Sequence, residues 1–243
     1  MANSVLLNNI DHKDLRIITT RSADYGDNVM FALTFPAEFR SVQAHYPIVF
    51  RKSVDGQFQP IVLFGFQDKQ NLFLGRPGWD ATYLPLMIER QPLLIGVGGD
   101  QQLMIHIDLD SPRISRTAGE AVFLEHGGAT EFLERMNSVL LAIHQGLEST
   151  KPFIAALLEH ELLESFVFDI TLADGSQNRL AGFYTIHEER LSALGGGALE
   201  RLSKAGHLAA IYMAIASLSN FRALIERLNQ HYAALANAGL AGQ

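Results

Sequence analysis

The stretch YPIVFRKSVDGQFQPIVLFGF, residues 46–66, gives the clearest structural signal in this sequence. Two runs of β-branched and aromatic side chains, residues 46–50 and 59–66, flank the dipeptide Asp55-Gly56. A two-residue Asp-Gly turn tolerates the positive φ angles that join neighbouring antiparallel strands. The stretch therefore predicts a β-hairpin.

Similar signals lie on both sides of this hairpin. Residues 29–35 predict one strand, which Pro36 ends. Residues 92–97 and 102–108 predict a second hairpin around Gly98-Gly99-Asp100. Further along, residues 165–172 and 178–186 predict a third hairpin, with its turn at Asp174-Gly175. Three hairpins indicate antiparallel sheet as the main strand arrangement.

Helical periodicity begins at Thr130, which we expect to cap a helix because its hydroxyl can accept a hydrogen bond from a backbone N–H of the first turn. We expect Glu131 and Arg135 to form an i,i+4 ion pair on this helix. Ser149 or Thr150 is expected to cap a second helix with Pro152 in its first turn. Apolar residues recur at three- and four-residue steps at Leu133, Met136, Leu140, Ile143 and Leu147.

Helix is also expected at residues 86–90, for one turn, and over residues 198–236, with breaks near Gly206 and Ser219-Asn220. The fold class predicted is α+β, with mainly antiparallel sheets packed against central and C-terminal helices. We expect an N-terminal adapter segment over residues 1–44, one domain over 45–236, and a flexible tail over 237–243.

Composition restricts the functional classes. The 243 residues include no cysteine, which excludes disulfides, thiolate metal sites and a cysteine nucleophile. The 19 basic and 26 acidic side chains give a net charge of −7, which argues against nucleic acid as a partner. The N-terminus lacks a basic segment followed by an apolar core, and no apolar run is long enough for a membrane span. We expect a cytoplasmic protein with no membrane span.

An ordered set of residues between Tyr46 and Leu228 resembles the SapC family of bacterial proteins. The set comprises Tyr46-Pro47-Ile48-Val49-Phe50, Phe58, Pro60, Leu63-Phe64-Gly65, Asn71-Leu72-Phe73, Trp79, Tyr83, Pro85, Arg90, Pro92, Asp108, Ser111-Pro112-Arg113, Gly119, Phe123, Leu180-Ala181-Gly182-Phe183-Tyr184, Leu194, Ala210, Tyr212 and Ser217-Leu218.

The resemblance implies a link by name to surface-layer loci, and relatives beside flavin-dependent tryptophan halogenases and TonB-dependent receptors. It implies no catalytic residue. The sequence departs from the family pattern at two places. Glu89-Arg90-Gln91 replaces a more basic stretch before Pro92, and His106 replaces a small or apolar residue.

Two residues of the second hairpin form a candidate metal site. On a strand, His106 and Asp108 point to the same side, and a His-x-Asp pair with a distant histidine is the ligand set of non-haem iron oxygenases. His126, His187 or His207 would supply the third ligand. The alternative is two polar residues on the outer face of a hairpin.

Candidate ligand-binding residues lie in two other places. Trp79, Tyr83 and Arg90 belong to an irregular, proline-rich segment, which either lines a ligand pocket or packs into the core. Asp108 and Arg113 either form a turn or bind a ligand, with the Arg113 guanidinium holding a carboxylate or phosphate.

The sequence contains no G-x-S-x-G, Walker A or H-E-x-x-H motif. The function expected is therefore a non-enzymatic accessory or binding protein without a cofactor, which recognises a protein partner or small ligand near Trp79–Arg90. One alternative is a metal-dependent oxygenase or hydrolase using His106 and Asp108, and another is a structural protein associated with the surface layer. A homo-oligomer is left open.

Overall fold

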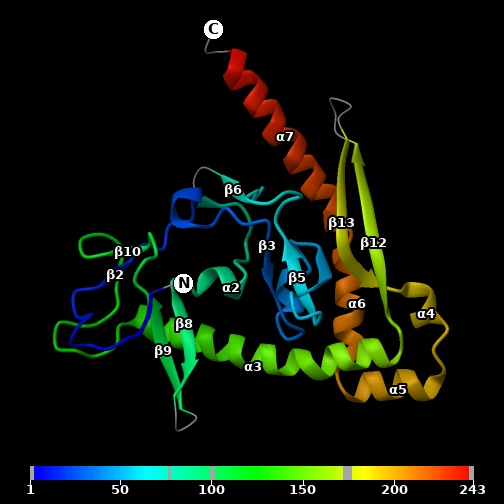
Figure 1. Ribbon diagram of the computed structural model, residues 1–243, viewed down its shortest axis with the longest axis horizontal. Coiled ribbons are helices and arrows are strands. Elements are labelled where there is room, and N and C mark those ends of the chain that lie inside the picture. The colour runs from blue at the N-terminus through cyan, green and yellow to red at the C-terminus, as the bar shows by residue number, and fades with distance from the viewer. Residues whose placement is uncertain (1–2, 76–77, 99–101, 172–176, 241–243) are drawn as a thin grey trace. The chain divides into compact units, whose positions relative to one another are not determined.

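The computed structural model describes residues 3–75, 78–98, 102–171 and 177–240 (Figure 1). The chain divides into two compact units. Unit 1 comprises residues 1–28, 74–80 and 84–145, and unit 2 comprises residues 29–73, 81–83 and 146–243. The helices and antiparallel sheets confirm the predicted α+β class.

Unit 1 is built from short strands and one long helix. Two of its sheets have three strands each, in the orders β1-β9-β8 and β10-β2-β11, and β6 pairs with β7. The elements of unit 1 are β1 Ser4–Leu6, β2 Arg16–Ile17, the 3-10 helix η1 Ala23–Tyr25, β6 Leu74–Gly75, β7 Gly78–Trp79, α2 Leu86–Glu89, β8 Leu93–Val97, β9 Leu103–Asp108, β10 Ile114–Ser115, β11 Glu120–Ala121 and the first part of α3 Glu131–Glu159.

The predicted second hairpin is confirmed, because β8 and β9 pair from Leu93↔Ile107 to Val97↔Leu103. Residues 99 and 100 of its predicted turn lie outside the described residues. The predicted helical turn at residues 86–90 is also confirmed, as α2.

The first 28 residues, predicted as part of an adapter, contribute strands to both three-stranded sheets of unit 1. Val5 of β1 lies opposite Ile107 of β9. Strand β2 lies between β10 and β11, with Ile17 fully buried. Residues 29–44 instead belong to unit 2, where β3 completes the sheet.

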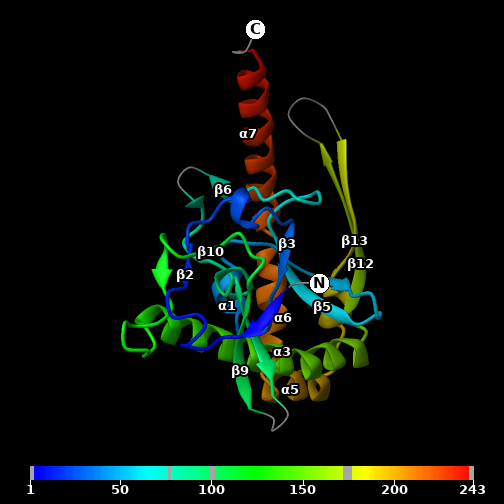
Figure 2. The ribbon, with the colours of Figure 1, turned by 60° about the vertical axis from the view of Figure 1, so that its left-hand side comes forward.

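Unit 2 contains a five-stranded sheet in the order β12-β13-β4-β5-β3. Its elements are β3 Phe31–Leu33, α1 Phe39–Val42, β4 Ile48–Lys52, β5 Phe58–Leu63, the second part of α3, β12 Leu163–Thr171, β13 Gln177–Ile186, α4 Glu188–Ser192, α5 Gly196–Lys204, α6 His207–Ser217 and α7 Asn220–Leu240. The β12–β13 ribbon extends past the shorter strands of the sheet (Figure 2).

The hairpin of residues 46–66 forms the centre of this sheet, as predicted. Strands β4 and β5 pair from Ile48↔Val62 to Lys52↔Phe58, and Gly56 in the turn has φ +81°. The third hairpin is confirmed as β12 and β13, while its predicted turn at Asp174-Gly175 lies outside the described residues.

The core of unit 2 is aromatic. Phe39 meets Phe153 edge to face, with ring centroids 5.9 Å apart, and Tyr46 meets Phe64 at 5.4 Å. All four side chains are buried, as expected where large rings replace water with close packing. The buried Ser217 hydroxyl of α6 accepts a hydrogen bond from the Ile48 backbone N–H at 2.8 Å, which joins the helix to β4.

The prediction of a separate helix capped at Ser149 or Thr150 is wrong, because α3 continues to Glu159. Both hydroxyls donate to the Gly146 carbonyl, at 2.8 and 2.9 Å, and so bond within the helix rather than cap a new one. The helix includes Pro152, whose missing N–H removes only one backbone bond. Thr130 is the cap of α3, as predicted, and its hydroxyl accepts from the Leu133 N–H at 3.3 Å.

The breaks predicted in the C-terminal helical region separate α5, α6 and α7. The last of these helices runs through residues 237–240, which were predicted as tail, and residues 241–243 lie outside the description. Among the described residues, His207–Leu235 is the stretch that length and composition would allow to cross a membrane, and 33% of its most apolar window is buried in the protein. Core helices pass the same test, so the lack of a membrane span stays a prediction.

Candidate ligand-binding cavity

A buried ion pair between Arg113 and Asp27 organises the interior of unit 1. Arg113 Nη2 lies 2.5 Å from Asp27 Oδ2, and both side chains are fully inaccessible to solvent. Arg113 Nη1 donates to the carbonyls of Ile18 and Thr20, at 2.8 and 2.9 Å. A buried guanidinium is tolerated only when a countercharge and hydrogen-bond acceptors replace water. The predicted ligand-binding residue Arg113 therefore binds groups of its own chain in this structure.

Arg21 extends this ion pair toward the surface. Its Nη1 lies 3.4 Å from Asp27 Oδ1, and it donates hydrogen bonds to the carbonyls of Ile88 and Glu89 at 3.0 and 3.2 Å. Burial, and secondarily the positive charge of Arg113, lower the pKa of Arg21, while the negative charge of Asp27 opposes that shift. Arg21 thereby ties the Arg113–Asp27 pair to the end of α2.

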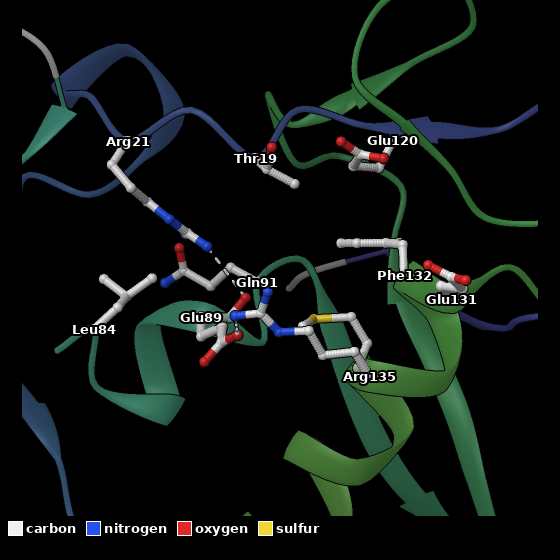
Figure 3. Close-up of a pocket in the computed structure, with 10 residues that line it drawn as sticks. Thr19, Arg21, Leu84, Glu89, Gln91, Glu120, Glu131, Phe132 and Arg135 are labelled. Carbon is white, nitrogen blue, oxygen red and sulfur yellow. Dashed lines mark hydrogen bonds and ion pairs between the residues drawn. The ribbon is translucent and has the colours of Figure 1, made fainter. Parts of the chain in front are cut away.

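A cavity of about 470 Å³ lies in unit 1, and Arg21, which pairs with Asp27, is one of the residues that line it (Figure 3). Figure 3 shows Arg135 reaching from α3 toward Glu89 of α2, with which it forms an ion pair. The Arg135 side chain is 70% exposed and that of Glu89 only 12%. The lining residues are Thr19, Arg21, Leu84, Glu89, Gln91, Glu120, Glu131, Phe132, Arg135 and Met136.

The cavity has two kinds of wall. Arg21, Glu89 and Gln91 form a polar side, and Glu120 and Glu131 add two further carboxylates to the lining. Leu84, Phe132 and Met136 supply apolar surface. Charged and amide groups that converge on a partly apolar concavity are typical of sites for small polar molecules.

Arg90, predicted as a ligand-binding residue, lies between two lining residues but does not line the cavity itself. Its Nη1 donates to the Leu93 carbonyl at 2.7 Å, and burial lowers its pKa. The hydrogen bond closes a turn that contains the cis peptide Gln91-Pro92. Arg90 thus holds the backbone that presents Glu89 and Gln91.

Trp79, Tyr83 and Asp108 do not line this cavity either. Trp79 is half-buried in β7, where it lies opposite Leu74. One carboxylate oxygen of Asp108 accepts from the Asp110 N–H at 3.2 Å, the local turn that its sequence context favours. These placements leave the predicted role of Trp79 and Asp108 in ligand binding as a prediction.

Tyr83 belongs to unit 2 and joins a polar cluster there. Its hydroxyl donates to Glu38 Oε1 at 3.1 Å, and its carbonyl accepts from the Tyr46 hydroxyl at 2.5 Å. The other oxygen of the buried Glu38 carboxylate accepts from the Thr34 hydroxyl at 2.7 Å. This cluster satisfies a buried carboxylate with hydroxyl donors.

His106 and Asp108 lie on β9 opposite Leu6 and Ser4 of β1. The His106 imidazole covers Gly96 on the neighbouring strand, where an added Cβ would lie 2.8 Å from the ring. In the part of the chain that the structure describes, no three His, Asp or Glu side chains come together to hold a metal ion. The proposed third ligands His126, His187 and His207 are therefore not gathered with this pair, and the metal hypothesis gains no support.

Reasoning from the sequence predicted none of the residues that line the cavity as site residues. The charged residues missed include Arg21, Glu89 and Arg135 of the lining and Asp27 behind it. The predicted Glu131–Arg135 pair is replaced by the Arg135–Glu89 pair from α3 to α2. One signal was present in the sequence, because Glu89 and Gln91 belong to the triplet that departs from the family pattern.

The family model described as SapC matches residues 7–224 of the chain. The match confirms the resemblance to the SapC family, and it begins well before Tyr46, at residue 7, and ends at residue 224. No curated protein and no solved structure matches the chain.

Proposed function

We propose that this chain, which belongs to the SapC family, is a non-enzymatic accessory or binding protein that holds a small polar ligand in the cavity of unit 1. The observation that carries the proposal is the cavity itself, at whose rim the exposed Arg135 meets the largely buried Glu89. The cavity adjoins the segment in which the sequence predicted ligand recognition.

The polarity of the lining supports a small molecule with both charged and apolar parts. The Arg135 side chain is far more exposed than that of Glu89, so a ligand that enters meets the Arg135 cation first and the Glu89 carboxylate behind it. A guanidinium carries five N–H donors, so Arg135 can bind a ligand carboxylate while it keeps its ion pair with Glu89. Phe132 and Met136 offer apolar contact to the rest of the ligand.

The buried charges behind the cavity support a binding role because they fix its polar wall. Arg113 holds Asp27, Asp27 holds Arg21, and Arg21 holds the two carbonyl groups at the end of α2. A wall that is set before the ligand arrives loses less conformational entropy on binding.

Ligand binding can be tested by thermal unfolding of the full chain with succinate, L-glutamate and putrescine as probes. A ligand at a hundred times its dissociation constant stabilises by about 2.7 kcal/mol, which corresponds to a rise in Tm of about 5–10 °C for a chain of this length. We expect at least one probe to raise the Tm of the wild type. The rise should be lost in Arg135→Ala for succinate or L-glutamate, whose carboxylates would pair with Arg135, whereas putrescine has no carboxylate and serves as the comparison.

Arg222→Ala is the matched control, because Arg222 is also an exposed arginine with an ion-pair partner but lies on α7. It should keep the full thermal shift. The proposal is overturned if Arg135→Ala responds as the wild type does, or if none of the three probes shifts the wild type at millimolar concentration.

The variant Trp79→Ala distinguishes a small ligand in the cavity from a protein partner that binds the Trp79–Arg90 segment. Trp79 is absent from the residues that line the cavity. We expect folded Trp79→Ala to keep the thermal shift with the probes. Loss of the shift would mean that the site extends to β7, and the assignment of the ligand to the cavity of unit 1 would be wrong.

A further inference from the structure

The lining of the unit 1 cavity carries more negative than positive charge. Three carboxylates, those of Glu89, Glu120 and Glu131, line it together with the guanidiniums of Arg21 and Arg135. Each guanidinium already has a carboxylate partner, because Arg135 pairs with Glu89 and Arg21 pairs with an aspartate behind the cavity. The charge that the protein leaves uncompensated in this lining is therefore negative.

The uncompensated charge belongs to Glu120 and Glu131. In the part of the chain that the structure describes, neither carboxylate has an ion-pair partner. Both side chains are exposed, so a ligand in the cavity can reach them. A concave site lined by an excess of one charge raises the local concentration of the opposite charge. The ligand that fits this lining carries a cationic group.

The first turns of α3 add an anion-binding group and an apolar wall to the same cavity. Glu131 and Arg135 form one row on the helix surface, and Phe132 and Met136 form the next row, each pair four residues apart. All four residues line the cavity. A row with both charges beside an apolar row matches a molecule whose ammonium, carboxylate and apolar chain branch from one carbon.

The spacing within the charged row also agrees with such a molecule. The Cβ atoms of Glu131 and Arg135 lie about 5–6 Å apart, as for any pair one helical turn apart. The ammonium nitrogen and carboxylate carbon of an α-amino acid lie about 2.5 Å apart. Two long side chains that start one turn apart can therefore converge on the two charged groups of one amino acid.

We infer that the ligand of this cavity is an apolar α-amino acid. Its ammonium pairs with Glu120 and Glu131, its carboxylate pairs with Arg135, and its side chain packs against Phe132 and Met136. The inference rests on the function proposed above and narrows it to one class of ligand. An acidic amino acid fits less well, because its second carboxylate enters a lining that already has an excess of carboxylates.

Titration calorimetry on the full chain tests the inference with L-leucine, 4-methylpentanoate and 3-methylbutylamine. The three molecules share the same apolar chain, and the second lacks the ammonium whereas the third lacks the carboxylate. We expect L-leucine to bind at least about tenfold more tightly than either of the other two, because only L-leucine makes both charged contacts.

The double variant Glu120→Gln/Glu131→Gln removes the negative charge but keeps the size of the side chains. It should weaken L-leucine about tenfold or more and leave 4-methylpentanoate unchanged or bound more tightly. Retained binding of 4-methylpentanoate also shows that the variant is folded. Glu134→Gln is the matched control, because Glu134 is an exposed glutamate of the same part of α3 that does not line the cavity. It should bind L-leucine as the wild type does.

The outcomes separate this inference from the proposed function. The inference is overturned if 4-methylpentanoate binds as tightly as L-leucine, or if the double variant and Glu134→Gln bind L-leucine equally well. It is also overturned if L-leucine does not bind while succinate or L-glutamate still raises the Tm, and the cavity then remains a site for carboxylates. Failure of all these molecules to bind overturns the inference and the proposed function together.

Discussion

Arg113 and Asp27 are 86 residues apart in the sequence and form an ion pair in which neither side chain is accessible to solvent. Arg113 also carries a buried Nε for which the described residues supply no hydrogen-bond acceptor. Water does not reach the Arg113 guanidinium, so its counterion Asp27 is essential to the stability of unit 1.

Asp27→Asn should lower the free energy of unfolding by about 3 kcal/mol or more, because it leaves the buried Arg113 charge without a counterion. Urea denaturation measures the change. Asp24→Asn is the control, since Asp24 is exposed and only three residues away. A loss of stability in Asp27→Asn no greater than in Asp24→Asn would contradict the role assigned to the pair.

Tyr83→Phe should cost about 1–2 kcal/mol of stability, because the buried Glu38 carboxylate loses the hydroxyl that donates to it. The same denaturation experiment applies, with Tyr212→Phe as control because Tyr212 is 55% exposed. The thermal shift with the cavity probes should not change in either variant. If Tyr83→Phe abolished that shift at unchanged stability, Tyr83 would belong to a ligand site, as the sequence first suggested.

Gly146→Ala should destabilise the protein although alanine is the better helix former. An added Cβ would lie 2.2 Å from the ring of Phe35, and overpacking of this kind costs about 1–3 kcal/mol. The comparison is Gly195→Ala, where the space around the new Cβ is open. Unfolding midpoints in urea should fall for the first variant and stay nearly constant for the second. A more stable Gly146→Ala protein would show that Phe35 moves aside.

Stability should fall as the pH is lowered through the titration of His207. The ring packs against Phe153, with centroids 5.6 Å apart, and burial lowers the pKa of His207 below its ordinary value of 6.5. The unfolded chain then binds this proton more readily than the folded one. The contribution is fully present above pH 6.5 and is lost as the pH falls through the lower, folded-state pKa.

His207→Gln should reduce the change in the free energy of unfolding with pH. Urea denaturation between about pH 7.5 and about pH 5 measures this change, because that range extends about one unit or more on each side of the ordinary histidine pKa. His126→Gln, at an exposed position, should keep the wild-type slope. A proton-resonance titration of His207 in the folded chain gives the pKa directly. A value above 6.5 would reverse the expected slope.

Local sequence was sufficient to predict the hairpins and most helix boundaries. Asp55-Gly56 predicted the β4–β5 turn because the preference for positive φ at Gly56 is a property of the residue itself. Thr130 predicted the start of α3 for the same kind of reason, since its hydroxyl reaches a backbone group three residues away. The unbroken run of α3 through residues 149–152 was missed, because a new helix was expected to start there, whereas packing of Phe153 in the core outweighs the one backbone bond lost at Pro152.

The sequence by itself determined the three hairpins, because each depends on residues close together in the chain. It also determined the α+β class and, through an ordered set of residues between Tyr46 and Leu228, the family. Only the tertiary structure decided what the charged residues do. Arg113 was open to a ligand in the sequence and is bound to Asp27 in the fold. Arg135 was predicted to pair with Glu131, four residues away, and instead pairs with Glu89, 46 residues away. Ion pairs depend on distance in space, which spacing along the chain does not give for residues on different elements.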